Sequence, residues 1–183
     1  MQEVLFLLTS DRVGGNSETL ARAIGACLPG SAAQHWLRLC DPALPAFADL
    51  RPGGTPAPTG RLAEIAAAMQ AATDIVLVAP IYWYALPAPA KTLIDHWSGW
   101  LDAPGFGFEA WIRGKRMWLV TSRADPAADV PELAEAMLRR SVEWLGMDWA
   151  GAVHACEADD TRLSSQTLTE AATRFRGLLA RQA

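Results

Sequence analysis

The sequence predicts a doubly wound α/β domain, which is a parallel β-sheet with helices packed on both faces. Short apolar runs alternate along the chain with longer stretches of helical periodicity. The runs Val4 to Leu8 and Ile75 to Ala79 are continuously apolar, as is typical of strands buried on both faces. No internal repeat is visible, so we expect one domain spanning residues 1–183.

Each expected strand is an apolar run bounded by turn or loop residues. In chain order the five strands are Val4 to Leu8, His35 to Leu39, Ile75 to Ala79, Arg116 to Val120 and Gly151 to Ala155. The expected helices lie after them, at Ser17 to Leu28, Arg61 to Ala72, Ala88 to Leu101, Val130 to Leu145 and Thr167 to Arg181.

Helix boundaries have their own chemical signals. Asp129 is placed to cap the helix that follows it, and Gly146 supplies a left-handed stop at its end. Pro87 and Pro89 mark the start of another helix, because amides in a first turn have no intrahelical acceptor to lose. The segment Asp41 to Gly60 is rich in Pro and Gly and is expected to form one long surface loop.

Composition excludes several classes of function. The 183 residues are 51% hydrophobic, enough for one substantial core. Sixteen basic and 20 acidic side chains give a net charge of −4, and no basic cluster is present, so nucleic acid is not expected as a partner. The apolar run before Thr9 is too short for a signal-peptide core or a membrane span, which predicts a cytoplasmic protein.

The cysteines indicate neither disulfides nor a metal site. Cys27, Cys40 and Cys156 are odd in number and share no ligand spacing with one another or with histidine. We therefore expect packed free thiols and no metal.

The first candidate site follows the first strand. In an open parallel sheet ligands bind beyond the carboxyl ends of the strands. The loop there carries hydroxyls, an amide, a guanidinium and backbone amides that can enclose a phosphate; its candidate residues are Ser10, Arg12, Gly15, Asn16, Ser17 and Thr19. Neither a dinucleotide fingerprint nor a P-loop is present. An ordinary helix cap at Asn16 or Ser17 is an equally weighted alternative.

The second candidate site is an aromatic loop after the third strand, at Pro80, Ile81, Tyr82, Trp83 and Tyr84. Three consecutive rings fit neither strand nor helix periodicity, so at least one must face solvent or a ligand. Ring stacking and main-chain hydrogen bonds there suit a flat, partly polar heterocycle. The alternative is that the rings pack on neighbouring helices or on a partner subunit.

The third candidate lies after the fourth strand, in the segment Val120 to Asp125. Ser122 and the local amides can reach a ligand held by the other two loops. A capped surface turn explains the same residues equally well.

These motifs resemble those of the flavodoxin-like NAD(P)H-dependent oxidoreductases, which include FMN and quinone reductases. The loop Ser10-x-Arg12-x-x-Gly15-Asn16-Ser17 is similar to their first flavin loop, and the stretch Pro80 to Trp97 is similar to their second flavin loop and following helix. Pro104 to Phe108 resembles the quinone-reductase branch.

The resemblance implies a five-stranded sheet of order 2-1-3-4-5 and an FMN cofactor. It implies that Ser10, Arg12, Asn16, Ser17 and Thr19 hold the FMN phosphate. The main chain from Pro80 to Tyr84 would border the isoalloxazine ring.

Some residues depart from the family pattern. Thr9 stands where the family usually has Gly, and Arg123-Ala124 replaces a frequent Gly-Gly. Asp11 beside a phosphate is unfavourable unless its side chain turns away or pairs with Arg12. The clustered cysteines of iron–sulfur relatives are missing, which excludes that branch.

The leading hypothesis is hydride transfer from NADPH or NADH through bound FMN to a quinone or another small electron acceptor. Flavin carries such chemistry, so no catalytic residue is assigned, and His35, His96 and His154 are expected to be surface or packed side chains. The alternatives are a flavodoxin-type electron carrier and a non-catalytic member that has lost FMN.

Aromatic residues concentrate after the second flavin loop, at Trp97, Trp100, Phe106, Phe108 and Trp111. One small core does not easily hide so many rings, so a homodimer is expected. The resemblance implies that the Gly-Phe-Gly-Phe segment lines a substrate pocket, either in its own subunit or in the neighbouring one. A packed loop within one chain is the alternative.

Overall fold

The computed structural model describes residues 1–157 and 162–181. Its strands are β1 (Glu3–Leu8), β2 (Ala33–Arg38), β3 (Asp74–Pro80), β4 (Arg116–Arg123) and β5 (Asp148–Cys156). Its helices are α1 (Asn16–Gly25), α2 (Gly60–Ala71), α3 (Ala88–Asp102), α4 (Phe108–Ile112), α5 (Glu132–Trp144) and α6 (Ser165–Ala180). All neighbouring strands are parallel, in the order β2-β1-β3-β4-β5, which confirms the predicted fold class and strand order.

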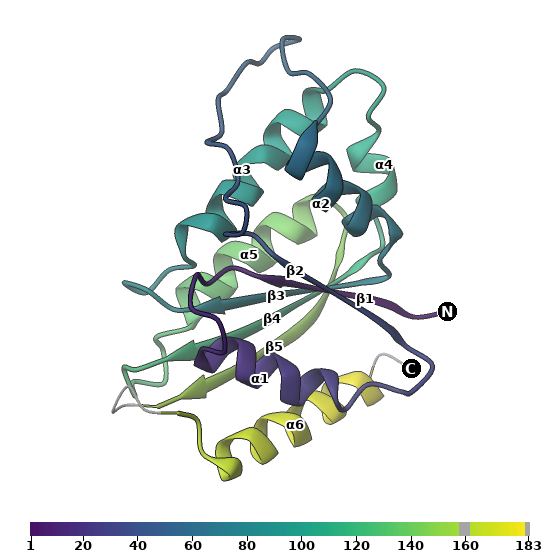
Figure 1. The fold of residues 1–183 in the computed structure, drawn as a ribbon. Helices are drawn as coiled ribbons and strands as arrows, with labels where there is room; N and C mark the ends of the chain where they lie inside the picture. Colours follow the sequence, from purple (N-terminus) through teal and green to yellow (C-terminus); the bar gives the residue numbers. More distant parts are fainter. Residues whose placement is uncertain (158–161, 182–183) are drawn as a thin grey trace.

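Helices cover both faces of the sheet (Figure 1). Helices α1 and α6 lie on one face, and α2, α3 and α5 lie on the other. Successive β1 side chains serve the two layers in turn, since Phe6 packs with the α1 layer while Leu5 and Leu7 pack with the α2 layer. Burial on both faces explains why the central strands are apolar at nearly every position.

The structure differs from the sequence prediction mainly at element ends. Strand β4 runs on to Arg123, because its register continues through Pro80↔Ser122 to β3 and Arg123↔Cys156 to β5. Ser122 therefore lies in the strand, whereas the sequence placed it in a loop. The short helix α4 was not predicted, since five residues carry too little periodicity to be recognised.

Two capping predictions are confirmed and one is wrong. Gly146 has a φ of 73°, the left-handed stop expected after α5, and Pro87 is the N-cap of α3, immediately before its first residue. Asp129, however, does not cap α5. The N-cap is Pro131, and Asp129 contributes only its backbone carbonyl, which accepts a hydrogen bond from the Glu132 amide.

The aromatic residues expected at a subunit interface are largely buried within one chain. Trp97, Trp100 and Phe108 are at most 4% exposed, and Phe106 and Trp111 pack edge-on against that cluster. A packed loop in one chain accounts for them, so these rings do not require a partner. The homodimer stays a prediction.

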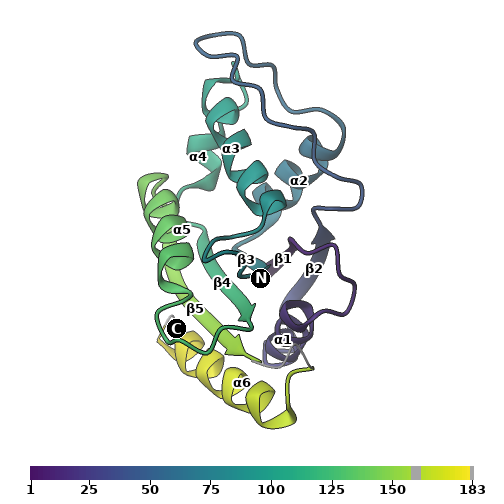
Figure 2. The same cartoon turned by 90° about the vertical axis from the view of Figure 1, so that its left-hand side faces the viewer.

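The two edges of the sheet differ in access. The carboxyl ends of the strands face the viewer in Figure 2, and the loops that follow β1, β3 and β4 leave the sheet on this side. Helix α4 leads into the amino end of β4 and therefore lies toward the opposite edge. Within the described residues, no helix has both the length and the apolar character needed to cross a membrane.

Candidate active site

A cavity of about 170 Å³ lies at the carboxyl edge of the sheet. Three segments far apart in the sequence form its wall: the β1–α1 loop, the end of β3 and the end of β4. Its lining residues are Ser10, Arg12, Gly15, Asn16, Ser17, Pro80, Ile81, Tyr82, Ser122, Arg123, Ala124 and Glu157. The structure therefore brings together most of the predicted site residues.

Helix α1 presents its N-terminus to the cavity. The N-cap is Gly15, so Asn16 and Ser17 are the first helical residues and neither is the cap that the alternative prediction required. Gly14, with a φ of 66°, takes the left-handed turn that leads into the helix. The helix N-terminus carries partial positive charge and favours an anion in the cavity.

Some polar residues of the β1–α1 loop line the cavity, and others lie outside it. The Ser10 hydroxyl accepts a hydrogen bond from the Arg12 amide at 3.2 Å, so its own proton can be donated to a ligand. Asp11 does not line the cavity. Its carboxylate instead lies beside Cys40, where burial first and Asp11 second raise the pKa of that thiol to about 12.

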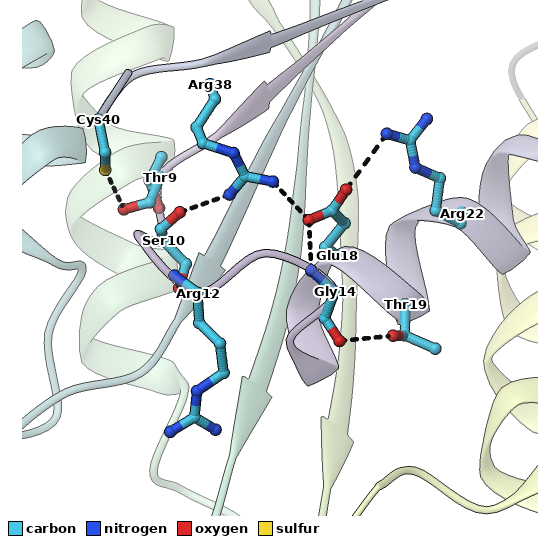
Figure 3. A network of polar contacts seen from close by, with 9 residues as sticks. All are labelled: Thr9, Ser10, Arg12, Gly14, Glu18, Thr19, Arg22, Arg38 and Cys40. Carbon is cyan, nitrogen blue, oxygen red and sulfur yellow. Dashed lines mark hydrogen bonds and ion pairs between the residues drawn. The ribbon is translucent and has the colours of Figure 1, made fainter. Parts of the chain in front are cut away.

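A polar network braces this loop from outside the cavity (Figure 3). Glu18 accepts hydrogen bonds from the Gly14 amide at 3.0 Å and from Arg22 at 3.2 Å. Arg38, at the end of β2, donates to Glu18 and to the Ser10 carbonyl, each at 2.6 Å. Sequence analysis missed these contacts, because no local pattern joins a β2 arginine to the β1–α1 loop.

The aromatic loop is a tight hairpin turn. Tyr82 and Ala85 exchange two backbone hydrogen bonds of 3.1 Å, and the central residues Trp83 and Tyr84 both have positive φ, 51° and 63°. Such turns normally carry Asn or Gly at these positions. Tyr82 lines the cavity, whereas Trp83 extends into solvent and is 94% exposed.

The end of β4 closes the third side of the cavity. The Ile81 amide donates to the Ser122 carbonyl at 2.9 Å, which ties the aromatic loop to β4. Arg123 and Ala124 line the cavity although they replace the family's Gly-Gly. Both residues lie in the third candidate segment, but the sequence analysis did not predict them as site residues, and no sequence signal pointed to Glu157, after β5.

Three predicted site residues lie outside the lining. The Thr19 hydroxyl donates to the Gly14 carbonyl at 3.4 Å, on the far side of the loop. Trp83 and Tyr84 occupy the tip of the hairpin, and the Tyr84 hydroxyl donates to Asp125 at 3.4 Å.

His154 belongs to a hydrogen-bonded chain beside the site. One ring nitrogen, Nε2, lies 2.8 Å from the Glu135 carboxylate and the other, Nδ1, lies 2.7 Å from the Thr121 hydroxyl. Because an ionised carboxylate only accepts, the neutral ring donates from Nε2 and accepts the Thr121 proton at Nδ1. Burial lowers the pKa of His154, and the hydrogen bond to Glu135 opposes this shift.

The chain was compared with known proteins. The family model described as flavodoxin-like fold matches residues 2–179. The chain belongs to this flavodoxin-like family. A search of curated proteins found no match.

Several solved structures share the flavodoxin-like fold with this chain at low identity. The Trp repressor binding protein from Bacillus subtilis is 19% identical with a TM-score of 0.69, over 92% of this chain and 95% of that one. An FMN-dependent NADH-azoreductase from Bacillus anthracis, in complex with FMN, is 15% identical with a TM-score of 0.67 over 100% of both chains. The NAD(P)H:quinone oxidoreductase from Methanothermobacter marburgensis is 15% identical with a TM-score of 0.70, over 96% and 92%.

The cavity residues fit a phosphorylated ligand. Ser17 is 3% exposed and Ser122 is 7% exposed, and both line the cavity. Neither hydroxyl is among the fully buried polar atoms that lack a partner in the described part of the chain, which is consistent with hydroxyls that open onto the cavity. Together with the α1 N-terminus they form a donor set suited to an anion, and Arg12 adds a cation.

Proposed function

We propose that this protein is an FMN-dependent NAD(P)H oxidoreductase that passes a hydride from NADPH or NADH to a quinone or another small acceptor. The observation that supports it is the cavity formed jointly by the β1–α1 loop, the start of the aromatic loop and the end of β4, with the buried residues Ser17 and Ser122 in its lining. Flavodoxin-like neighbours named as azoreductase and quinone oxidoreductase favour the same class of activity.

The β1–α1 loop would hold the phosphate of FMN. Ser10, Asn16 and Ser17 would donate from side chains, and the α1 N-terminus would add backbone donors. Arg12 would contribute the charge-assisted bond, which is stronger than a neutral one. Thr19 was predicted to share this role, and its bond to the Gly14 carbonyl makes it a weaker candidate.

The aromatic loop and the end of β4 would hold the ring. Pro80, Ile81, Tyr82 and Ser122 line the cavity, while Trp83 and Tyr84 are exposed at the tip of the hairpin. FMN, when bound, would supply the redox chemistry, since its ring takes up and returns a hydride. The protein would orient the ring and shield one face from water.

A homodimer is part of this proposal, on a surface that shares only Trp97 with the aromatic residues expected at the interface. A groove of about 300 Å³ between α3 and α5 is lined by Trp97, Leu101 and Trp144, and Trp144 is 75% exposed. The protruding Trp144 beside a groove makes this patch suited to a self-complementary, two-fold contact. Light scattering should give twice the monomer mass for the wild type and the monomer mass for Trp144→Ser.

Stopped-flow mixing of the FMN-loaded protein with NADPH or NADH tests the proposed activity. We expect the flavin absorbance near 450 nm, roughly where oxidised flavins absorb, to bleach within seconds and to return when a quinone is added. Free FMN at the same concentration is the control. Absence of bleaching within minutes with both nucleotides would contradict the proposal.

A further inference from the structure

Arg38 joins two parts of the β1–α1 loop from the neighbouring strand. Its Nη1 donates to the Ser10 carbonyl and its Nη2 to the Glu18 carboxylate, each at 2.6 Å. The side chain is 17% exposed, so both bonds are only partly screened by water. Figure 3 shows Arg38 lying between Ser10 and Glu18.

The bond to Ser10 sets the orientation of a peptide group beside the cavity. A carbonyl oxygen that faced the cavity would repel an anion, because it carries partial negative charge. Arg38 directs this oxygen toward the end of β2. Ser10 itself lines the cavity, so its side-chain hydroxyl is available to a ligand there.

Glu18 fixes the other end of the loop. Its carboxylate accepts from the Gly14 amide at 3.0 Å, just before the N-cap of α1. Burial alone would raise the pKa of Glu18, but the hydrogen bonds from Arg38, Gly14 and Arg22 outweigh burial, and the net pKa is lowered. The carboxyl therefore stays ionised at neutral pH. Gly14 is thereby held in its left-handed turn.

Neither side chain of the Arg38–Glu18 pair lines the cavity. Arg12 does line it, and in Figure 3 its guanidinium extends away from the network formed by Arg38 and Glu18. The pair therefore affects a ligand through the loop that it holds and not by direct contact.

We propose that Arg38 and Glu18 are positioning residues that hold the β1–α1 loop in the conformation that accepts the phosphate of a flavin nucleotide. This inference rests on the proposed function. Arg38 turns the Ser10 carbonyl away from the anion, and Glu18 keeps Gly14 and the start of α1 in place.

A purely structural ion pair would behave differently from a positioning pair. Loss of overall stability weakens binding of any ligand at the site, whereas loss of the loop conformation weakens binding of the phosphate alone. FMN and riboflavin differ only in that phosphate. The ratio of their affinities is therefore a readout that general destabilisation does not move.

The experiment measures dissociation constants for FMN and for riboflavin by quenching of flavin fluorescence. Arg38→Met should weaken FMN binding about tenfold or more, the size expected for a lost charge-assisted hydrogen bond, and change riboflavin binding less than about twofold. Glu18→Gln should fall between Arg38→Met and the wild type, because the amide oxygen still accepts from Gly14. Thermal melting confirms that each variant is folded.

Arg22→Met is the matched control, because Arg22 also donates to Glu18 but otherwise stacks on Trp36 in β2 and, among the described residues, has no hydrogen bond to the β1–α1 loop. It should leave the FMN-to-riboflavin ratio unchanged. Equal losses for both ligands, or no loss in Arg38→Met and Glu18→Gln, would overturn the inference while FMN binding by the wild type upholds the proposed function. A wild type that binds neither flavin would overturn both.

Discussion

The amino and carboxyl edges of the sheet each carry a network of charged side chains, and the network at the carboxyl edge lies beside a cavity. At the amino edge, Asp74 is 1% exposed and its carboxylate receives bonds of 2.7 to 2.9 Å from Arg116, Trp118 and Thr73. At the carboxyl edge, Ser17 and Ser122 are also buried, and both line the cavity.

This comparison distinguishes side chains that stabilise the fold from side chains that can contact a ligand. The Asp74 network uses every strong acceptor site on its carboxylate, so it can bind nothing further. The carboxyl-edge network of Arg38 and Glu18 braces the β1–α1 loop from its outer side, and the cavity beside it is lined by polar side chains that a ligand can contact. A substitution at the amino edge should therefore change stability, and one at the carboxyl edge should change binding.

Asp74→Ala should have the largest effect. It leaves the Trp118 indole without an acceptor and Arg116 without its counter-ion, and should lower the free energy of unfolding by about 3 kcal/mol. Urea denaturation measures the change. FMN affinity at low temperature, where the variant is folded, should stay within about twofold of the wild type. A large loss of FMN affinity would break the separation between the edges.

Arg12→Met should weaken binding. Loss of the charge-assisted bond should weaken FMN binding by about tenfold to a hundredfold. Arg176→Met, an exposed α6 arginine distant from the cavity lining, is the matched charge control. If both variants bind FMN equally well, Arg12 does not face the phosphate.

Trp83→Gly should stabilise the protein while impairing the site. Trp83 is almost fully exposed and has a φ of 51°, a conformation that costs a bulky residue about 1 kcal/mol and glycine almost nothing. The melting temperature should rise and FMN binding should weaken. A lower melting temperature would show that the indole makes a stabilising contact. Leu133→Gly, at an exposed apolar position on α5, should lower stability instead.

His154 should give the smallest effect, visible in the pH dependence of stability. Burial lowers the pKa of His154, and Arg174 and Arg123 act in the same direction against Glu135. The folded protein therefore binds the proton less readily than the unfolded chain, whose histidine titrates near about 6.5. Unfolding free energy should decline as the pH falls below that value.

His154→Gln should remove this decline, since glutamine does not titrate. Melting curves between about pH 5 and pH 8 measure it. Identical pH profiles for the wild type and the variant would contradict the assignment. The Asp74 network lowers the pKa of that carboxyl despite burial, so its contribution should be lost only in more acidic solution.

The sequence predicted what depends on local pattern. The apolar runs located the strands, and Pro87 and Gly146 marked helix ends where the structure has them. The strand order came from the family resemblance, because periodicity does not say which strands are neighbours. Asp129 was assigned as a cap from its residue type, but the turn before α5 places Pro131 at that position.

The parts that the sequence missed depend on contacts between distant segments. Arg38 and Glu18 meet only because β2 lies beside β1. Ser122 and Arg123 extend β4 because β3 and β5 on either side offer hydrogen-bond partners, although neither residue is apolar. Asp11 beside a phosphate loop looked unfavourable until the fold placed Cys40 next to it.

A crystal structure of the protein grown with FMN tests the central claim most directly. The account predicts a phosphate within hydrogen-bond distance of the Ser10, Asn16 and Ser17 side chains, and a ring between Tyr82 and Ser122. FMN bound in the α3–α5 groove, or a carboxyl-edge cavity that remains empty at saturating FMN, would contradict it.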